Sequence, residues 1–577
     1  MLLKTYFLSS LIIFLAGSFL SGTWSTTHEA LRILLLQVGL IMVSVSAYKY
    51  LRSLPGAILG VIGCLCIVQI LYHIIAWVSI PVYFGLFAGV ALFIKNHKNV
   101  LFEKWEKAFL PAVVAACTVL MGSHYYDFAL KERFEDLGFH QDTLFHAAIT
   151  TMLKTYNVSS TGLNGLEPID YHILVHRITA AVSILTKNPV WVSFPLVNLL
   201  IIGPGVVCAL AFCITKISSN KITMQASMLL AGVLLSIDKL LNLKSVANWD
   251  HIFCSESYGL AISLFLIGLP FFFTESKKIE RVGAGLLMGA ACFAKISLIP
   301  FCFTAILCGQ WNQLNKNIRL VLVPTVLVGI LYLLKSKILS LQFEPFYYAT
   351  VHNKIWNHEF TTFLKEPFSG TLADTLKALW SLSLFLVGNI FPLVTCLLYS
   401  WKKNQEQKWF FILNLFLFLC FLQIKVAGVF YLYNPAYILA LPFFGIYLAN
   451  KWANQNTTKL GLFLLCLINT CLNTSSNLYK KTEFKSGLKE REVSVVFFTE
   501  IKNATKDPNG SFFTADVSND LRKKVEHYNA EARYLFYFPV LIEKAFIRLL
   551  PNQKPPNLKY YGYEEYYNKN GKLKINY

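Results

Sequence analysis

The chain has 577 residues, of which 55% are hydrophobic and only 15% are charged, and its net charge is +20. Soluble domains carry about 25% charged residues, so this composition excludes an ordinary soluble protein. Apolar runs long enough to cross a bilayer recur from Leu2 to Leu472, which predicts an all-α polytopic membrane protein.

The positive charge gathers in short segments between the apolar runs. The positive-inside rule accounts for lysines at such places, so the charge does not predict a nucleic-acid partner. Anionic membrane lipids or a lipid-phosphate ligand are the expected partners. Nearly all of the 13 cysteines lie inside apolar runs, as small buried side chains do, and predict no disulfide framework.

Taken in order, the chain divides into six predicted regions with about fourteen or fifteen spans in all. The regions are N-terminal spans (1–122), a large outer loop (123–190), a membrane core (191–334), a second, aromatic-rich outer loop (335–375), C-terminal spans (376–472) and a polar tail (473–577). Counting membrane crossings places the two loops and the polar tail outside the cytoplasm.

The membrane core contains an apolar run with Lys295 near its middle and basic residues on both flanks. One crossing would place a basic flank outside, whereas two crossings would leave each half too short for a bilayer about 30 Å thick. We therefore predict two short or re-entrant segments with Lys295 at the turn, facing a wet cavity. The alternative is one tilted helix from which this lysine snorkels.

The tail from about Asn473 is polar and rich in Lys, Asn and Tyr. A strand-like run at Val493–Phe498 and a helical stretch around 535–550 predict a small α/β domain on the outer face.

The large outer loop holds the long polar stretch Gly138–Arg177, and any chemistry is expected there. Asp142 and His146 are four residues apart on a predicted helix, so both face the same way. His172 and His176 repeat that spacing. The candidate residues in this stretch are His140, Asp142, His146, Asp170, His172, His176 and Arg177.

Other interpretations compete for these residues. Asp142 is equally suited to cap a helix, and a single histidine such as His146 more often bonds a backbone carbonyl. A divalent metal site from His140, Asp142, His172 and His176 stays open on ligand type, although the spacing matches no zinc pattern. The chain has no Walker loop, no GxGxxG after a strand and no GxSxG motif, which argues against an ATP-driven pump, a dinucleotide enzyme and an α/β-hydrolase.

Three features resemble the GT-C superfamily of multi-span glycosyltransferases, which includes protein O-mannosyltransferases and aminoarabinose transferases. They are an acidic residue in an early outer loop (DTLFHAAI, at Asp142), a short hairpin reading GAGLLMGAACFAKIS that ends beside Lys295, and a polar tail on the outer face. The chain departs from that superfamily in that about five spans precede the acidic loop, and Asp142 has no second carboxylate beside it.

The resemblance implies transfer of a sugar from a polyprenyl-phosphate donor to a lipid, glycan or protein acceptor. It implies that Asp142 accepts the proton of the acceptor hydroxyl, with His146 beside it, and that Lys295 and Arg177 stabilise the departing phosphate. A bacterial inner membrane is the expected location. The alternatives are a transporter or flippase of a lipid-linked or anionic substrate, and a polysaccharide polymerase or ligase.

Overall fold

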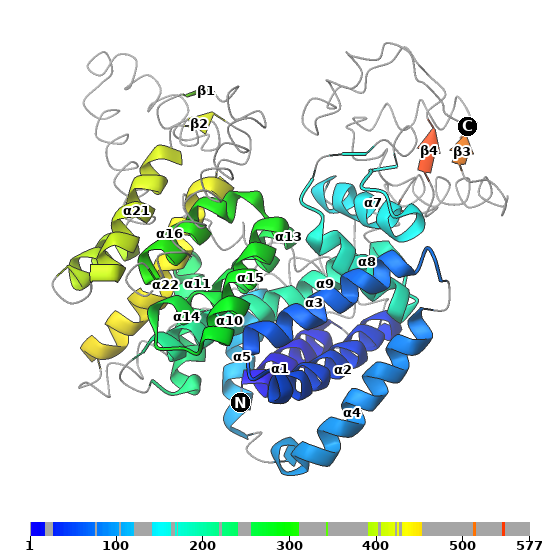
Figure 1. The fold of residues 1–577 in the computed structure, drawn as a ribbon, viewed down its shortest axis with the longest axis horizontal. Coiled ribbons are helices and arrows are strands. Elements are labelled where there is room, and N and C mark those ends of the chain that lie inside the picture. Colours follow the sequence, from blue (N-terminus) through cyan, green and yellow to red (C-terminus); the bar gives the residue numbers. More distant parts are fainter. Residues whose placement is uncertain are drawn as a thin grey trace, which may run out of the picture.

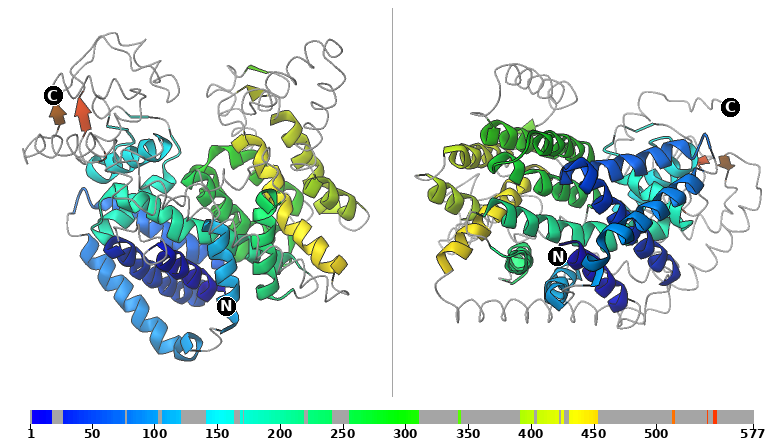
Figure 2. Two further views of the ribbon diagram at one scale, coloured as in Figure 1. Left: turned by 180° about the vertical axis from the view of Figure 1, so that it is seen from behind. Right: turned by 60° about the horizontal axis from the view of Figure 1, so that its bottom comes forward.

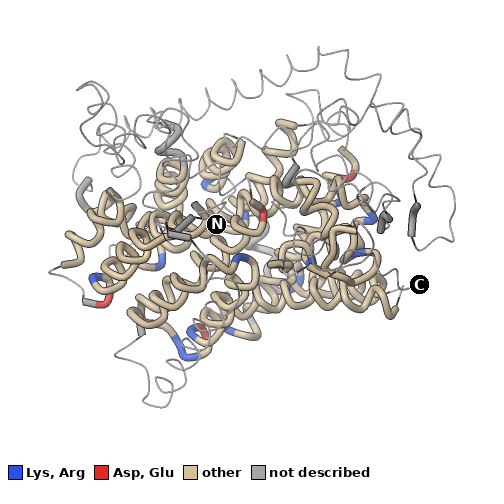
Figure 3. Tube along the Cα trace, turned by 90° about the horizontal axis from the view of Figure 1, so that it is seen from above, with Lys and Arg blue, Asp and Glu red and all other residues tan. Residues whose placement is uncertain are grey.

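The computed structural model is mostly helical, as predicted. It describes residues 2–17, 27–75, 78–102, 106–120, 141–162, 168–169, 171–218, 222–240, 255–310, 342–343, 391–401, 405–421, 424–425, 430–452, 512–514, 540 and 545–547. Five helices within these ranges are long and apolar enough to cross a membrane: Thr27–Tyr48, Leu54–Leu71, Val190–Ile217, Glu256–Phe273 and Tyr431–Asn450. Charged residues are sparse along the helices (Figure 3). The chain is therefore a helical membrane protein.

The first helices form a layer at one side of the bundle (Figure 1). α2 packs against both α3 and α4, and α1 packs against α5. α4 lies at the edge of the bundle in Figure 1 and Figure 2, and the rings of Phe84 and Phe87 are exposed on it, as expected of side chains that meet lipid. The bounds are α1 Leu2–Leu15, α2 Thr27–Leu51, α3 Leu54–Leu71, α4 Ser79–Phe102 and α5 Glu106–Leu120.

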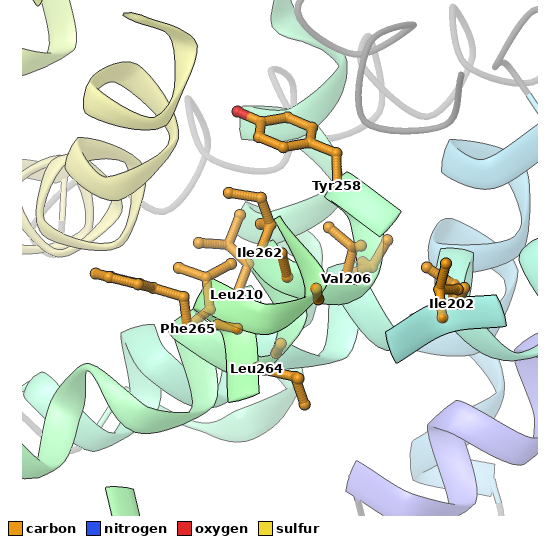
Figure 4. Close-up of a cluster of buried hydrophobic side chains, with 14 of the residues drawn as sticks. Ile202, Val206, Leu210, Tyr258, Ile262, Leu264 and Phe265 are labelled. Carbon is orange, nitrogen blue, oxygen red and sulfur yellow. The ribbon is translucent and has the colours of Figure 1, made fainter. Parts of the chain in front are cut away.

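At the centre of the bundle lie the spans Val190–Ile217 and Glu256–Phe273, whose side chains are buried almost all round. Figure 4 shows their contact, where Val206 and Leu210 of α10 lie beside Ile262 and Phe265 of α13. A helix that is apolar on every face is stable only inside a bundle or a membrane. The bounds are α9 Val190–Val197, η3 Asn198–Ile202, α10 Gly203–Ile217, α11 Met224–Leu240, α13 Glu256–Gly268, α14 Pro270–Phe273 and α22 Phe430–Trp452.

The π-helical segment η3 interrupts the span formed by α9 and α10. A π-turn leaves backbone carbonyls outside the regular α-helical ladder, and polar side chains of the first helices bond them. Tyr6 Oη donates to Ile201 O at 2.9 Å, while Ser10 Oγ and Gln37 Nε2 donate to Leu200 O at 2.6 and 3.2 Å. These bonds fix α1 and α2 against the central span.

Lys295 lies at a break in the chain. α15 (Lys278–Ala294) ends there, Lys295 is extended with φ −154° and ψ 112°, and a 3-10 turn, η4 (Ile296–Leu298), leads into α16 (Ile299–Gln310). Cys302 Sγ, seven residues after the break, donates to Met288 O, seven residues before it, at 3.7 Å. α15 and α16 therefore run antiparallel, as a helical hairpin with Lys295 at its turn.

The hairpin packs along α3. The position of a Cβ added to Gly283 of α15 would be 2.9 Å from Ser53 Oγ and 3.1 Å from Gly56 N, so the two helices touch closely near their starts. Twelve residues beyond Gly283 comes Lys295, and twelve beyond Gly56 comes Val68. At a common rise of about 1.5 Å per residue, Lys295 thus lies level with the last turn of α3.

The predicted outer loop forms two helices, α7 (Gln141–Tyr156) and α8 (Leu174–Thr186), that pack on each other. α8 lies across the ends of the first helices. Asn188, just after it, donates to Glu29 O in the first turn of α2, and Tyr83 near the start of α4 donates to Leu185 O. Arg177 donates to Gln69 near the end of α3. All three contacts lie at one end of the bundle, which we call the α8 end.

Several basic residues lie at the opposite end. Arg52 precedes α3, while Lys278 and Arg281 open α15, whose first turns lie beside the start of α3. Lys216 lies in the last turn of α10.

The remaining described elements are short or peripheral. β1 (Gln342–Phe343) pairs antiparallel with β2 (Ile424–Lys425), and α16 packs on α21 (Gln405–Phe421). A further apolar helix covers Phe391–Ser400.

Little of the predicted α/β tail lies within the described residues. β3 (Phe512–Thr514) pairs parallel with β4 (Ala545–Ile547). β4 falls where the sequence predicted a helix, so that helix prediction is wrong over these three residues, because pairing with β3 decides their conformation. The two short strands do not support an α/β domain, and the predicted strand at 493–498 lies outside the described residues.

Candidate functional site

Three of the predicted histidines gather with Lys295 at the α8 end. His146 on α7 and His176 on α8 face each other, with 3.0 Å between His146 Nδ1 and His176 Nε2. His172 Nε2, just before α8, lies 3.3 Å from the Nζ of Lys295. The hairpin turn thus meets the outer-loop helices. We call His146, His172, His176 and Lys295 the histidine–lysine cluster.

Three of the four residues of the cluster are almost closed to solvent. His176 is fully buried, and His146 and Lys295 are 7% and 8% exposed. Burial lowers the pKa of His146 well below its ordinary value, and the neighbouring His176 and Lys295 lower it further. Burial and then Lys295 do the same for the pKa of His172. Both imidazoles are therefore neutral at pH 7.

Lys295 sets the hydrogen-bonding role of His172. An ammonium group only donates, so Nε2 of His172 accepts, and the ring proton of this neutral histidine is on Nδ1. Ser257 Oγ lies 3.0 Å from the same Nε2, and Ser255 Oγ lies 3.1 Å from Ser257 Oγ. The start of α13 therefore contributes two hydroxyls beside the imidazole.

Aromatic rings frame the cluster. The Lys295 ammonium lies over the ring of Tyr431 at 4.1 Å from its centre, close enough for a cation–π contact. Tyr171 stacks on His172 with 3.9 Å between ring centres, and Phe194 stacks near both His146 and His176. These contacts fix the orientation of the imidazoles.

Tyr258 adds a buried polar atom to the same region. Its ring lies edge-on to Tyr431 with 5.1 Å between centres, and its Oη is buried with no hydrogen-bond partner in the described part of the chain.

The other predicted site residues are placed only in part. Asp142 lies in the first turn of α7, one helical turn before His146, but its side chain is outside the described part of the structure. His140 and Asp170 lie outside the described residues altogether. The Nη1 of Arg177 donates to Gln69 Oε1 on α3 and, at 3.1 Å, to Oδ1 of Asn157, which directly follows α7.

Sequence reasoning missed several contributors: Ser257, Tyr258 and Tyr431 open apolar spans, and Phe194 lies within one. Their residue types resemble ordinary span residues. Only their position near the α8 end of a span, which the crossing count gives approximately, could have singled them out.

The described residues contain no group of three His, Cys, Asp or Glu side chains arranged to hold a metal ion. Two members of the metal set considered from sequence, His140 and the side chain of Asp142, lie outside what is described, so that interpretation stays a prediction. What the cluster offers is a buried cation beside neutral imidazoles and hydroxyls. Such a set binds an anion and donates or accepts single protons.

Comparison of the chain with protein-family models, curated proteins and solved structures gives no significant match. The resemblance to GT-C enzymes therefore stays a prediction from the quoted motifs.

Proposed function

We propose that the chain is a membrane glycosyltransferase that moves a sugar from a polyprenyl-phosphate donor to a lipid, glycan or protein acceptor. The observation that supports this most is the contact between Lys295, at the hairpin turn, and His172, in the outer loop. The sequence singled out these two segments independently, one because an apolar run contains a lysine and the other because it is rich in polar residues. In the structure they meet in a single cluster.

The proposed face is extracytoplasmic. The end opposite the cluster carries the basic residues Arg52, Lys216, Lys278 and Arg281. Because basic residues are enriched on the cytoplasmic side of membrane proteins, they support a cytoplasmic location for that end. The proposed topology is a GT-C-like arrangement of about fourteen or fifteen spans in a bacterial inner membrane. In this topology the C-terminal tail lies on the same outer face as α7 and α8.

The proposed reaction divides its work between two groups. An acceptor hydroxyl oxygen forms a bond to the anomeric carbon while the bond from that carbon to the donor phosphate oxygen breaks, and the electron pair leaves with the phosphate. The Asp142 carboxylate accepts the hydroxyl proton. Lys295, held between His172 and the Tyr431 ring, stabilises the charge that develops on the phosphate.

The histidines have supporting roles in this scheme. His146 is neutral and lies one helical turn after Asp142, so it can share a hydrogen bond with the acceptor without adding charge. His176 orients His146 through the 3.0 Å contact between their rings, and the apolar spans would hold the polyprenyl chain.

The test uses full-length protein in nanodiscs with a series of polyprenyl-phosphate sugars, and it measures released polyprenyl phosphate. Asp142→Asn removes a base and little volume, so turnover should vanish while donor binding remains, and His146→Ala should cost less. The transferase proposal fails if no donor turns over. Uptake of an anionic or lipid-linked substrate into proteoliposomes, equal in wild type and Asp142→Asn, would instead support a transporter.

A further inference from the structure

Two cysteines lie on opposite arms of the α15–α16 hairpin. Cys292 is on α15, three residues before Lys295 at the turn, and Cys302 is on α16, seven residues after it. The Sγ of Cys302 donates to Met288 O at 3.7 Å. The same oxygen accepts the backbone N–H of Cys292, because bonds within an α-helix join residues four apart. The sulfur of Cys302 therefore reaches the side of α15 that carries Cys292.

The two thiols also interact directly. The Cys292 side chain lies within hydrogen-bonding reach of the Cys302 thiol, and both cysteines are free in the structure. A disulfide brings the two sulfurs to about 2.05 Å and the two Cβ atoms to about 3.8 Å. Thiols that already contact each other need only a rotation of their side chains and a small shift of the helices to form this bond.

The two cysteines differ in exposure. Cys302 is 4% exposed. Cys292 is half-buried and borders the outer surface of the bundle, since Phe293 and Ile296 beside it are 78% and 46% exposed. A small oxidant therefore meets Cys292 first, and Cys302 is placed to react second, from inside the hairpin.

We propose that Cys292 and Cys302 form a reversible oxidation site, at which a peroxide joins them by a disulfide. The Cys292 thiolate attacks one oxygen of hydrogen peroxide, the O–O bond breaks, and the leaving hydroxide takes up the thiol proton to become water. The sulfur of Cys302 then attacks the sulfenic acid on Cys292, the S–O bond breaks, and a second water leaves. The two thiols lose two electrons and two protons, which reduce the peroxide to two waters.

The disulfide closes a loop that contains the hairpin turn. Residues 293–301 lie inside this loop, Lys295 among them. A cross-link restricts the conformations that a closed loop can adopt, so the oxidised hairpin holds Lys295 in fewer positions than the reduced one. The oxidation site uses only the two thiols and does not depend on sugar transfer.

Peptide mapping of the full-length protein in detergent tests the proposal. The protein is treated with hydrogen peroxide, free thiols are blocked with N-ethylmaleimide, and trypsin then cleaves after Lys295, between the two cysteines. Mass spectrometry should show peptide 282–295 linked to peptide 296–316 in the treated wild type. Reduction before blocking should remove the linked pair. A treated wild type without this linked pair would overturn the proposal.

Cys308 provides a matched control, because it lies on the same tryptic peptide as Cys302 and is also buried, at 7% exposed. Cys308→Ser should keep the linked pair, whereas Cys292→Ser and Cys302→Ser should each lose it. A linked pair that persists in Cys302→Ser would also overturn the proposal, because Cys308 would then be the partner of Cys292.

Thermal unfolding tests whether the bond restrains the hairpin. The oxidised wild type should unfold about 2 °C or more above the reduced wild type, and Cys292→Ser should show no such difference after the same treatments. Equal unfolding temperatures of the linked and the reduced wild type would overturn the restraint of the turn.

Discussion

The ammonium of Lys295 lies 3.3 Å from Nε2 of His172, although 123 positions separate the two residues in the chain. The contact joins the turn of the α15–α16 hairpin to the segment that leads into α8. It fixes the tautomer of His172. It also holds the Lys295 ammonium in a buried position, where the residue is only 8% exposed. A charge retained in such a place costs stability, which points to a functional use.

Replacing Lys295 by Met should remove the charge that the proposed reaction needs and keep most of the volume. We expect turnover to fall by about a hundredfold or more, as when a transition-state donor is lost, with Lys295→Arg retaining part of it. The measurement is kcat and KM for the polyprenyl-phosphate donor. Lys278→Met, an exposed lysine at the start of the same helix, is the matched control. Turnover in Lys295→Met above half of the wild-type value would remove Lys295 from the mechanism.

Lowering the pH should destabilise the histidine–lysine cluster before it affects most of the chain. The pKa values of His146 and His172 are lowered in the folded protein, by burial first and then by neighbouring His176 and Lys295. Below the unfolded value of about 6.5 the unfolded chain therefore binds more protons, so stability is lost as the pH falls through that value. The slope is at most about 1.4 kcal/mol per pH unit for each histidine.

Thermal unfolding in detergent at pH 7.5, 6.0 and 5.0 measures this loss. His172→Gln, which cannot take up a proton, should show a shallower decline than wild type over the same range. Identical declines in the two proteins would mean that His172 does not stay neutral in the folded state.

The contact between α3 and α15 predicts that alanine substitutions at two glycines of α15 have different effects on stability. An alanine at position 283 would press on Ser53 Oγ at 2.9 Å, and Ser53 caps α3 by accepting from Gly56 N at 3.2 Å. Gly283→Ala should cost about 1 kcal/mol, the worth of a lost helix cap. Nothing lies within 4 Å of the corresponding position at Gly289, so Gly289→Ala should be neutral or stabilising by up to about 1 kcal/mol.

Thermal stability of both variants in the same detergent checks this pair. If Gly283→Ala were as stable as Gly289→Ala, the two helices could not be packed as closely as the structure has them.

Local patterns were enough to predict a helical membrane protein and to single out three histidines that lie close together in the structure. The apolar runs predicted the spans because a bilayer demands long apolar helices. The basic residues on both sides of Lys295 predicted its turn, since one crossing would violate the charge rule. Helical spacing singled out His146, His172 and His176, which the structure brings together.

Tertiary contacts could not be read from those patterns. Tyr431 and Ser257 look like ordinary span residues until the bundle places them beside Lys295 and His172. Arg177 shows a second kind of error. It follows His176 in the sequence, which suggested a shared role, but successive residues on a helix point in different directions and contact different neighbours. Which neighbour it meets depends on how α3, α7 and α8 pack.

α8 is about 20 Å long, by the rise of its 13 residues, and it connects helices that would otherwise tilt independently. One end is bonded to α3 through Arg177 and the other to α4 and α2 through Leu185 and Asn188. A change in tilt of any of these three spans must therefore shift α8 as a unit, and His176 with it. We therefore expect the alignment of the histidine–lysine cluster to depend on the thickness and lateral pressure of the surrounding bilayer.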